Sequence, residues 1–331
     1  MKEAILSMLT GGGGAFVSGE AMSEALGVSR AAIWKAIDTL RAEGCDIEAA
    51  PRRGYRLRTT PDRLTEGTVR PYVDPARKGG LIVLPTVDST NNYAKALAMD
   101  PAGFADGTAI AADEQTGGRG RLGRSFQSPK GKGVYLTMLW KPAIAPAQAV
   151  DLTAYAAVAV CDGIEAAVGV RPGIKWTNDI VLGGKKLCGI LTEMSVEGES
   201  GALSYIVCGI GINANHAPED FSDEVRPIAT SLARELGHPI DRGRLCGCVI
   251  DALDRMYGIW LSGGGSYWER YRDGCLTLGK PVRLIRGDRT EEAFAEALAP
   301  DFGLVVRHPD GRRETVTTGE VSVRGLFGYF A

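Results

Sequence analysis

The sequence is short of residues on which several classes of protein depend. Its seven cysteines are an odd number and include no C-x-x-C pair, so neither a disulfide framework nor the common zinc-cluster spacing is indicated. Its three histidines (His216, His238 and His308) lie in no recognisable nucleophile motif, which argues against Ser-His-Asp or Cys-His hydrolysis. No apolar run is long enough to span a bilayer, and the first residues lack the apolar core of a secretory leader. We therefore expect a cytoplasmic protein with reduced thiols and no membrane partner.

The chain as a whole also has no large excess of positive or negative charge. Thirty-eight Lys and Arg residues stand against 40 Asp and Glu, a net charge of −2, so any binding to nucleic acid has to come from a local patch. A length of 331 residues predicts two or three domains. Three stretches differ in pattern, and we expect domains over 1–62, 65–272 and 275–331. The predicted fold class is α+β: a winged helix-turn-helix, a central mixed α/β-sheet domain and a small C-terminal SH3-like barrel.

The pattern of the first stretch predicts three helices followed by a hairpin. Ser18 and Ser29 are suited to cap the second and third helices, and Gly27 and Gly44 to end them. An apolar stripe at i, i+4 and i+7 predicts the packed face of the third helix, formed by Ile33, Ile37 and Leu40. A hairpin is expected to pair 47–49 with 55–58. A helix, a short turn, a second helix and a basic hairpin together make a winged helix-turn-helix pattern.

This first stretch also holds a local excess of positive charge. Between Val28 and Arg58 there are seven Lys and Arg residues against four Asp and Glu. We interpret it as a DNA-binding unit whose third helix enters the major groove and whose wing holds phosphate, with the candidate contacts Ser29, Arg30, Trp34, Lys35, Arg52 and Arg53. The alternative is a helical packing or protein-contact module with solvated arginines. Because the excess is modest, DNA affinity should depend on dimerisation.

The remaining stretches are dominated by strands. Between 65 and 272 we predict strands over 81–84, 108–112, 134–139, 174–181, 187–194 and 204–212, with helices over 91–99, 150–168, 231–236 and 244–261. After 274, short β runs are expected at 282–285, 293–298, 304–307, 313–316 and 321–323, separated by turn residues. Five short strands close together predict the small barrel.

The densest chemical signal is a glycine- and arginine-rich segment, Gln115-Thr-Gly-Gly-Arg-Gly-Arg-Leu-Gly-Arg124. From Gln115 to Lys141 there are six Lys and Arg residues and no acidic one. Interleaved glycines and arginines suit a loop that closes over an anion with backbone N–H groups and guanidinium forks. A solvated basic loop is the alternative, but a strand is predicted on each side, as is usual for functional loops. The spacing is neither that of a Walker A loop nor that of a dinucleotide fingerprint.

Several further segments suit a ligand site when taken together. Asp88-Ser-Thr-Asn-Asn92 follows one predicted strand and opens a helix, where N–H groups are exposed. Lys175-Trp-Thr-Asn-Asp179 lies within the strand predicted over 174–181, whose alternation places Lys175, Thr177 and Asp179 on one face and Asn178 on the other. Lys186–Leu191 begins the next strand. The glycines of Gly209-Ile-Gly-Ile-Asn213 leave room for a ligand to approach the backbone. Taken singly, these segments also suit plain caps and hairpins.

In this order the motifs resemble the biotin protein ligase family, in its bifunctional form that is also the biotin operon repressor. The resemblance covers essentially the whole chain and rests on five motifs: STN at 89–91, GRGRLGR at 118–124, KWTND at 175–179, KLCGIL at 186–191 and GIGIN at 209–213. Two positions depart from the family pattern, which usually has proline where Thr177 stands and often tryptophan where Phe126 stands. Neither departure removes a reacting group, so we expect altered loop geometry at most.

The resemblance implies a two-step reaction. Biotin's carboxylate attacks the α-phosphate of ATP to give biotinyl-5′-adenylate and pyrophosphate, and a lysine of a biotin carboxyl carrier protein or domain then attacks the adenylate. Because the first step brings two anions together, cations must be concentrated there. The repressor form of the family forms a homodimer when the adenylate is bound, and the dimer binds operator DNA.

The family motifs carry roles over to residues of this chain. The implied biotin-binding residues are Ser89, Thr90, Asn91, Gln115, Arg119, Gly120, Arg121 and Lys186. The candidates for ATP and its phosphates are Arg124, Lys175, Asn178 and Asn213. The candidate catalytic residues are Arg119, Arg121, Lys186 and Asp179, where Asp179 could also accept the proton of the incoming lysine. Mg²⁺ is expected with ATP, and its candidate protein ligands are Asp179 and Asn213.

Two other functions remain open from the sequence. A lipoate ligase would use the same adenylation chemistry, although the STN and GRGRLGR motifs favour biotin. A biotin-sensing regulator without catalysis would not need the full set of Arg119, Arg121, Lys175, Asp179 and Lys186.

Overall fold

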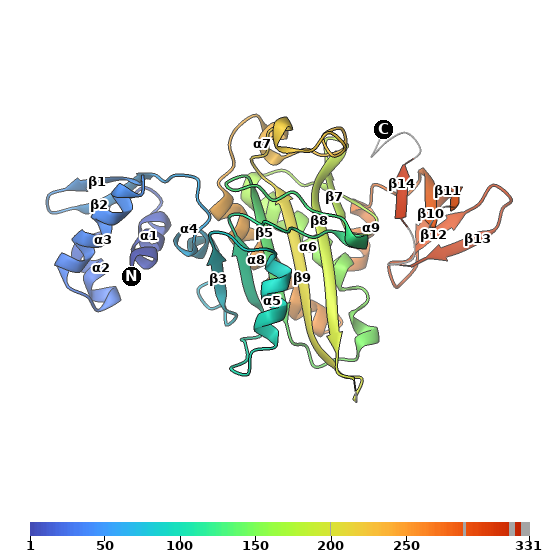
Figure 1. Cartoon of the computed structure of the whole chain (residues 1–331), viewed down its shortest axis with the longest axis horizontal. Helices are drawn as coiled ribbons and strands as arrows, with labels where there is room; N and C mark the ends of the chain where they lie inside the picture. Colours follow the sequence, from blue (N-terminus) through green and yellow to red (C-terminus); the bar gives the residue numbers. More distant parts are fainter. Residues whose placement is uncertain (199, 287–288, 318–321, 326–331) are drawn as a thin grey trace.

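The computed structural model describes residues 1–198, 200–286, 289–317 and 322–325. Figure 1 shows a helical unit with a hairpin at the N-terminal end, a large central sheet with helices on both faces, and a small sheet at the other end. None of the helices in these ranges has the length and apolar content needed to cross a membrane. The predicted α+β fold class is confirmed.

The N-terminal unit has the predicted helices and hairpin: α1 (Lys2–Gly11), α2 (Gly19–Leu26), α3 (Arg30–Ala42), β1 (Asp46–Ala50) and β2 (Gly54–Thr59). The Ser18 hydroxyl accepts from the first turn of α2, the Ser29 hydroxyl accepts from the N–H of Ala32, and Gly27 ends α2 in the left-handed conformation. The predicted stripe on α3 is buried in a separate small core. Gly54 is required, because a Cβ there would meet the carbonyl oxygen of Val17 at 2.1 Å.

The central sheet has seven strands in the order β3-β4-β5-β9-β8-β7-β6. Only the β3–β4 pair is parallel. The strands are β3 (Leu81–Leu84), β4 (Thr108–Ala112), β5 (Gly133–Trp140), β6 (Gly173–Lys175), β7 (Asp179–Leu182), β8 (Lys185–Val196) and β9 (Leu203–Asn213). Alternating residues of β4 enter two different cores, Ile110 with α5 (Thr90–Ala98) and its neighbours Ala109 and Ala111 with α6 (Leu152–Val168) and α8 (Arg242–Leu261). Helices therefore cover both faces of the sheet (Figure 1).

Short helices that the sequence pattern did not predict join the units. Helix α4 (Glu66–Val69) and the 3₁₀ turn Arg70–Tyr72 lie between α1 and α8, and α9 (Tyr267–Gly274) follows α8. Three further 3₁₀ turns cover Arg121–Gly123, Pro146–Ala149 and Pro218–Asp220. The short helix α7 (Leu232–Leu236), by contrast, is one that the sequence predicted. Helices of four to eight residues are too short to show a clear apolar period, which explains why they were missed.

The C-terminal unit is a five-stranded antiparallel sheet in the order β13-β12-β11-β10-β14. Its strands are β10 (Pro281–Arg286), β11 (Arg289–Leu298), β12 (Leu304–Arg307), β13 (Arg313–Val316) and β14 (Ser322–Gly325); Val321, the first residue of the last predicted run, lies outside the described residues. Its apolar face joins the central core, where the Phe302 ring lies edge-on to Tyr271 at 5.3 Å and to Tyr155 at 5.7 Å. The two units therefore share one core.

The single strand predicted over 174–181 is wrong. The chain instead forms β6, turns at 176–178 and returns as β7, with Lys175 opposite Asp179 in an antiparallel pair. The predicted shared face of Lys175, Thr177 and Asp179 is lost with the strand. Asn178 and Asp179 are residue types that favour turns, but the alternation of Lys175, Thr177 and Asp179 was interpreted as one continuous strand. Trp176, within the turn, is buried like the strand residues beside it, at 5% exposure.

Candidate active site

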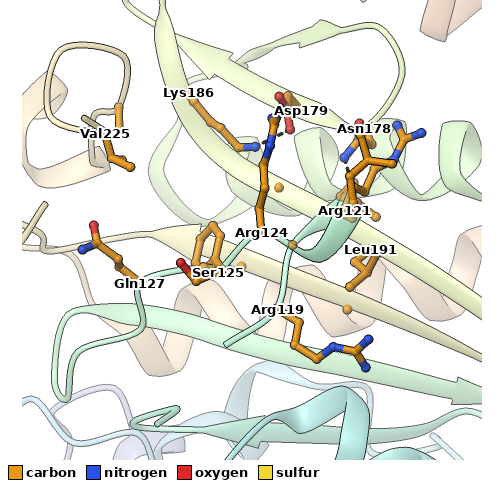
Figure 2. Close-up of a pocket in the computed structure, with 18 of the residues that line it drawn as sticks. Arg119, Arg121, Arg124, Ser125, Gln127, Asn178, Asp179, Lys186, Leu191 and Val225 are labelled. Carbon is orange, nitrogen blue, oxygen red and sulfur yellow. Dashed lines mark hydrogen bonds and ion pairs between the residues drawn. The ribbon is translucent and has the colours of Figure 1, made fainter. Parts of the chain in front are cut away.

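The candidate catalytic, biotin-binding and ATP-binding residues meet at one cavity of about 1080 Å³. Five elements or turns supply them: the start of α5, the 115–127 loop, the β6–β7 turn, the start of β8 and the end of β9. The predicted residues that line the cavity are Ser89, Thr90, Asn91, Gln115, Arg119, Gly120, Arg121, Arg124, Lys175, Asn178, Asp179, Lys186 and Asn213. Segments more than a hundred residues apart in sequence are thus brought to one place, as Figure 2 shows.

The start of α5 forms a buried polar wall. Ser89, Thr90 and Asn91 are 2%, 3% and 4% exposed. The side-chain oxygen of Gln115 accepts from the Thr90 N–H at 2.9 Å, and the side-chain NH₂ of Gln115 donates to the Ser128 hydroxyl at 2.8 Å. The backbone N–H and hydroxyl of Thr90 are therefore held by the segment that precedes the arginines.

Asn91 is packed directly on a glycine of β9. A Cβ on Gly209 would lie 2.3 Å from the Asn91 side-chain oxygen, far inside van der Waals contact. The same oxygen lies 2.6 Å from the Thr137 hydroxyl of β5, and the Asn91 amide nitrogen donates to the Glu193 carboxylate of β8 at 3.0 Å. The room that Gly209 leaves, which the sequence analysis assigned to a ligand, is therefore taken by a protein side chain.

The arginine loop is folded into a tight turn over the cavity. Gly120 N–H donates to the Arg124 carbonyl at 2.7 Å, and Arg119 pairs with Ser125 in a short β-bridge. Leu122 has a positive φ of 56° and is 70% exposed. In Figure 2 the Arg124 side chain extends toward the Lys186–Asp179 pair, whereas Arg119 points away from it. The arginines of the loop therefore serve different parts of the site.

Arg121 contacts the β6–β7 turn. Its guanidinium donates to the Thr177 hydroxyl at 3.1 Å and to the Asn178 side-chain oxygen at 2.9 Å. The Asn178 amide in turn donates to the Ile190 carbonyl of β8 at 2.9 Å. Thr177, which stands where the family usually has proline, thus supplies an acceptor that proline lacks.

The same turn is held by the C-terminal part of the chain. The Trp176 indole N–H donates to the Phe302 carbonyl at 2.8 Å, the Trp176 backbone N–H donates to the Thr277 hydroxyl at 3.0 Å, and the Tyr271 hydroxyl donates to the Thr177 carbonyl at 3.0 Å. Burial raises the pKa of Tyr271 well above its ordinary value, which keeps this donor protonated. The C-terminal sheet and α9 therefore help to place the turn that Arg121 contacts.

Lys186 and Asp179 form an ion pair in the lining of the cavity. The Lys186 ammonium lies 2.6 Å from the Asp179 carboxylate, and both side chains are largely buried, at 29% and 19% exposure. Gly189 lies beneath them, since a Cβ there would come within 3.3 Å of the Lys186 ammonium. A lysine held in this way lines the cavity, where it can meet an anionic ligand.

The residues that could hold a metal are few. Among the described residues, no group of three or more His, Cys, Asp or Glu side chains is arranged to hold a metal ion. The Asn213 amide donates to the Thr230 carbonyl at 3.0 Å, and its side chain is 4% exposed. Asp179 and Asn213 both line the cavity, a donor set that suits Mg²⁺ shared with substrate phosphates better than a metal held by protein alone.

The candidate DNA-contacting residues lie on the surface of the N-terminal unit. Arg30, Trp34, Lys35, Arg52 and Arg53 are all exposed, whereas the Ser29 hydroxyl caps α3. Arg30 is paired with Glu20 at 2.6 Å, which reduces its availability. On the wing, Arg53 lies over the Phe16 ring at 4.2 Å.

Sequence reasoning missed several residues that line the cavity or support the residues that line it. Glu193 and Thr137 hold Asn91, and neither belongs to a motif that was singled out. Phe221, Val225, Ile228 and Ala229 also line the cavity, together with Ser222 and Glu224, and Arg283 and Ile285 of the C-terminal sheet reach it. The alternation of β5 and β8 could have shown which side Thr137 and Glu193 face, but not that both meet the start of α5.

His216 is buried against Phe221. Its ring stacks on Phe221 at 5.2 Å, and burial lowers its pKa from 6.5 to about 4. The imidazole is therefore neutral near pH 7 and supports the segment by packing.

Comparison with known proteins places this arrangement among ligases. Models of three families match the chain: the biotin/lipoate A/B protein ligase family over 83–213, an HTH domain over 2–56 and the biotin protein ligase C-terminal domain over 277–324. The bifunctional ligase/repressor BirA of Bacillus subtilis is 39% identical over 84% of this chain and 86% of its own length. That of Escherichia coli is 33% identical over 94% of each chain. A solved biotin protein ligase from Aquifex aeolicus, in complex with biotin and ATP, has a TM-score of 0.61 and 28% identity, covering 74% of this chain and 99% of its own.

Proposed function

Since the chain belongs to the biotin protein ligase family, in its bifunctional ligase and repressor form, we propose that the cavity between α5, the arginine loop and β8 is where biotin and ATP react. The protein is a biotin–[acetyl-CoA-carboxylase] ligase that uses ATP and carries an HTH repressor unit. The observation that supports this location best is the cavity itself, which joins a buried polar wall to a set of cations.

The polar wall suits the ring of biotin. The ureido group of biotin carries two N–H donors and one carbonyl acceptor, and Ser89, Thr90 and Gln115 offer hydroxyl and amide partners at the start of α5. Asn91 supports the wall from behind, since Thr137, Glu193 and Leu191 already contact its side-chain amide. A buried wall with partners already placed reduces the ordering required on binding.

The cations suit the adenylation step. When the carboxylate oxygen of biotin attacks the α-phosphorus of ATP, the bond to pyrophosphate breaks and negative charge builds up between the two substrates. Lys186, Arg124 and Arg121 line the cavity and can stabilise that charge electrostatically. The apolar side chains of Phe221, Val225 and Ile228, which line the cavity, offer a surface for the adenine base. Asp179 and Asn213 are the candidates to hold Mg²⁺, which would neutralise phosphate charge.

The transfer step requires a lysine nucleophile. We propose a biotin carboxyl carrier protein or domain as its source; its amine attacks the acyl carbon, AMP leaves, and the amine loses a proton. Asp179, 2.6 Å from Lys186, is the candidate acceptor of that proton. Arg121 would retain the adenylate until the carrier arrives.

The N-terminal unit serves repression under the same proposal. α3 would enter the major groove with Trp34 and Lys35, while Arg52 and Arg53 of the wing meet phosphate. A homodimer would place two such units on two DNA half-sites. The added contacts would compensate for the modest positive charge of each unit. We propose that dimerisation accompanies adenylate binding and that the domains divide near 62–65 and 272–275, as the sequence predicted. Sedimentation velocity with biotin and ATP, compared with protein alone, tests the dimer.

One experiment tests the ligase activity and its substrate. Purified protein is incubated with ATP, Mg²⁺, an apo carrier domain and either biotin or lipoate, and the carrier is weighed by mass spectrometry. We expect a gain of one biotin and no gain with lipoate. A lipoate gain would favour the lipoate ligase, and no gain with biotin still bound would favour a sensing regulator.

A matched pair of variants tests the site. Lys186→Ala should abolish pyrophosphate release, because it removes an ammonium group from the lining of the cavity. Lys185→Ala, one residue earlier on β8 and outside the cavity lining, is the control and should release pyrophosphate at the wild-type rate. Equal rates in both variants would refute the assigned role of Lys186.

A further inference from the structure

Glu193 joins two parts of the cavity that the sequence motifs leave separate. It lies on β8, two residues beyond Leu191, and its side chain is 25% exposed. Its carboxylate accepts from the Asn91 amide at 3.0 Å and from the Lys95 ammonium at 2.6 Å, and it lies 3.6 Å from the Arg119 guanidinium. Asn91 and Lys95 belong to α5, while Arg119 belongs to the arginine loop. One carboxylate thus contacts both the polar wall and the loop.

The first consequence concerns the orientation of Asn91. An ionised carboxylate only accepts hydrogen bonds, so the NH₂ end of the Asn91 amide must face Glu193. The oxygen end must then face the Thr137 hydroxyl, which lies 2.6 Å from it. The same hydroxyl is 2.8 Å from that of Thr90, so the orientation fixed at Glu193 extends to the polar wall.

The second consequence concerns charge. Burial alone would raise the pKa of Glu193, but the hydrogen bonds from Lys95 and Asn91, together with the charges of Lys95 and Arg119, lower it below its ordinary value. Glu193 is therefore ionised at neutral pH, and it attracts Arg119 to the α5 side of the cavity. The Asn92 side-chain oxygen holds Arg119 on the same side, at 3.2 Å.

We propose that Glu193 is a positioning residue for biotin: its carboxylate fixes the Asn91 amide and holds Arg119 at the biotin end of the cavity. This inference rests on the proposed function, because it assumes that biotin lies against the start of α5. Glu193 itself need not touch the ligand. Its effect should fall on biotin and spare ATP, whose candidate contacts lie around Lys186 and Arg124.

The test compares Glu193→Gln with Glu193→Asp and with Glu197→Gln. Glutamine keeps the size of Glu193 but can donate as well as accept, so it no longer fixes the Asn91 amide and no longer attracts Arg119. We expect the dissociation constant for biotin, measured by calorimetry without ATP, to rise at least about tenfold, while the KM for ATP stays within about twofold of wild type. Aspartate keeps the charge and should fall between glutamine and wild type. Glu197, exposed beyond the end of β8, is the matched control and should leave both values unchanged.

A double variant separates positioning from general damage. If Glu193 acts partly through Arg119, the loss caused by Glu193→Gln should be smaller in an Arg119→Ala background than in the wild type. The inference is overturned if biotin affinity is unchanged in Glu193→Gln, or if biotin and ATP are weakened equally. If the wild-type protein neither binds biotin nor labels a carrier, the proposed function fails instead, whatever the variants do.

Discussion

Replacing Gly209 with alanine should damage the biotin end of the cavity selectively. The added Cβ would lie 2.3 Å from the Asn91 side-chain oxygen, a separation that cannot be accommodated without movement. Asn91 has little freedom to move, because it is 4% exposed and is held by Thr137 at 2.6 Å and by Glu193 at 3.0 Å. Either β9 or the Asn91 side chain must therefore shift.

The expected loss follows from that overlap. Overpacking of a buried site costs about 1–3 kcal/mol, and every 1.4 kcal/mol corresponds to about a tenfold change in a dissociation constant. If the strain is relieved at Asn91, biotin affinity should fall by roughly 5-fold to 140-fold. Isothermal titration calorimetry with biotin alone measures the dissociation constant. The melting temperature of the same variant shows how much of the strain lowers folding stability instead.

The control is Gly258→Ala in α8, where an added Cβ meets nothing within 4 Å. Alanine favours a helix over glycine by about 1 kcal/mol, so this variant should bind biotin normally and melt at the same temperature or higher. A Gly209→Ala protein that binds biotin within twofold of wild type would refute the packing argument.

Four further outcomes are expected. Arg121→Gly should release the adenylate and raise labelling of a bystander protein on a biotin blot; labelling no higher than wild type would exclude a retaining role. Arg242→Met leaves the Asp113 carboxylate, 2.8 Å from a fully buried guanidinium, without its partner. That loss costs about 3–5 kcal/mol, so the melting temperature should drop by several degrees, and an unchanged melt would contradict the assignment. Because the pKa of His216 is lowered from 6.5 to about 4, the free energy of unfolding should fall as the pH drops through that range. Urea denaturation at pH 7 and pH 4 should show a smaller fall in the free energy of unfolding for His216→Phe than for wild type. Trp34→Ala, which removes a side chain that is 58% exposed, should weaken binding to the duplex that wild type selects from a random library, with biotinylation unchanged as the internal control.

The sequence by itself was sufficient where a local pattern has one physical solution. Ser18 and Ser29 cap their helices because a hydroxyl at that position satisfies exposed N–H groups, and the α3 stripe is buried because its residues recur at helical spacing. Motifs in a fixed order identified the family, and every residue they assigned to catalysis, biotin or ATP lines the cavity. These signals depend on neighbours in the chain, so they can be read without the fold.

Tertiary structure decided how distant segments meet. The reversal at 176–178 is held by Thr277, Phe302 and Tyr271, residues about a hundred positions away, so no period within the strand could reveal it. Glu193 looks like an ordinary strand residue until β8 lies beside α5 and the arginine loop. The sequence determined which chemical groups are present and which local elements carry them, whereas packing decided which groups share a hydrogen bond, because that depends on distances through space that no local pattern encodes.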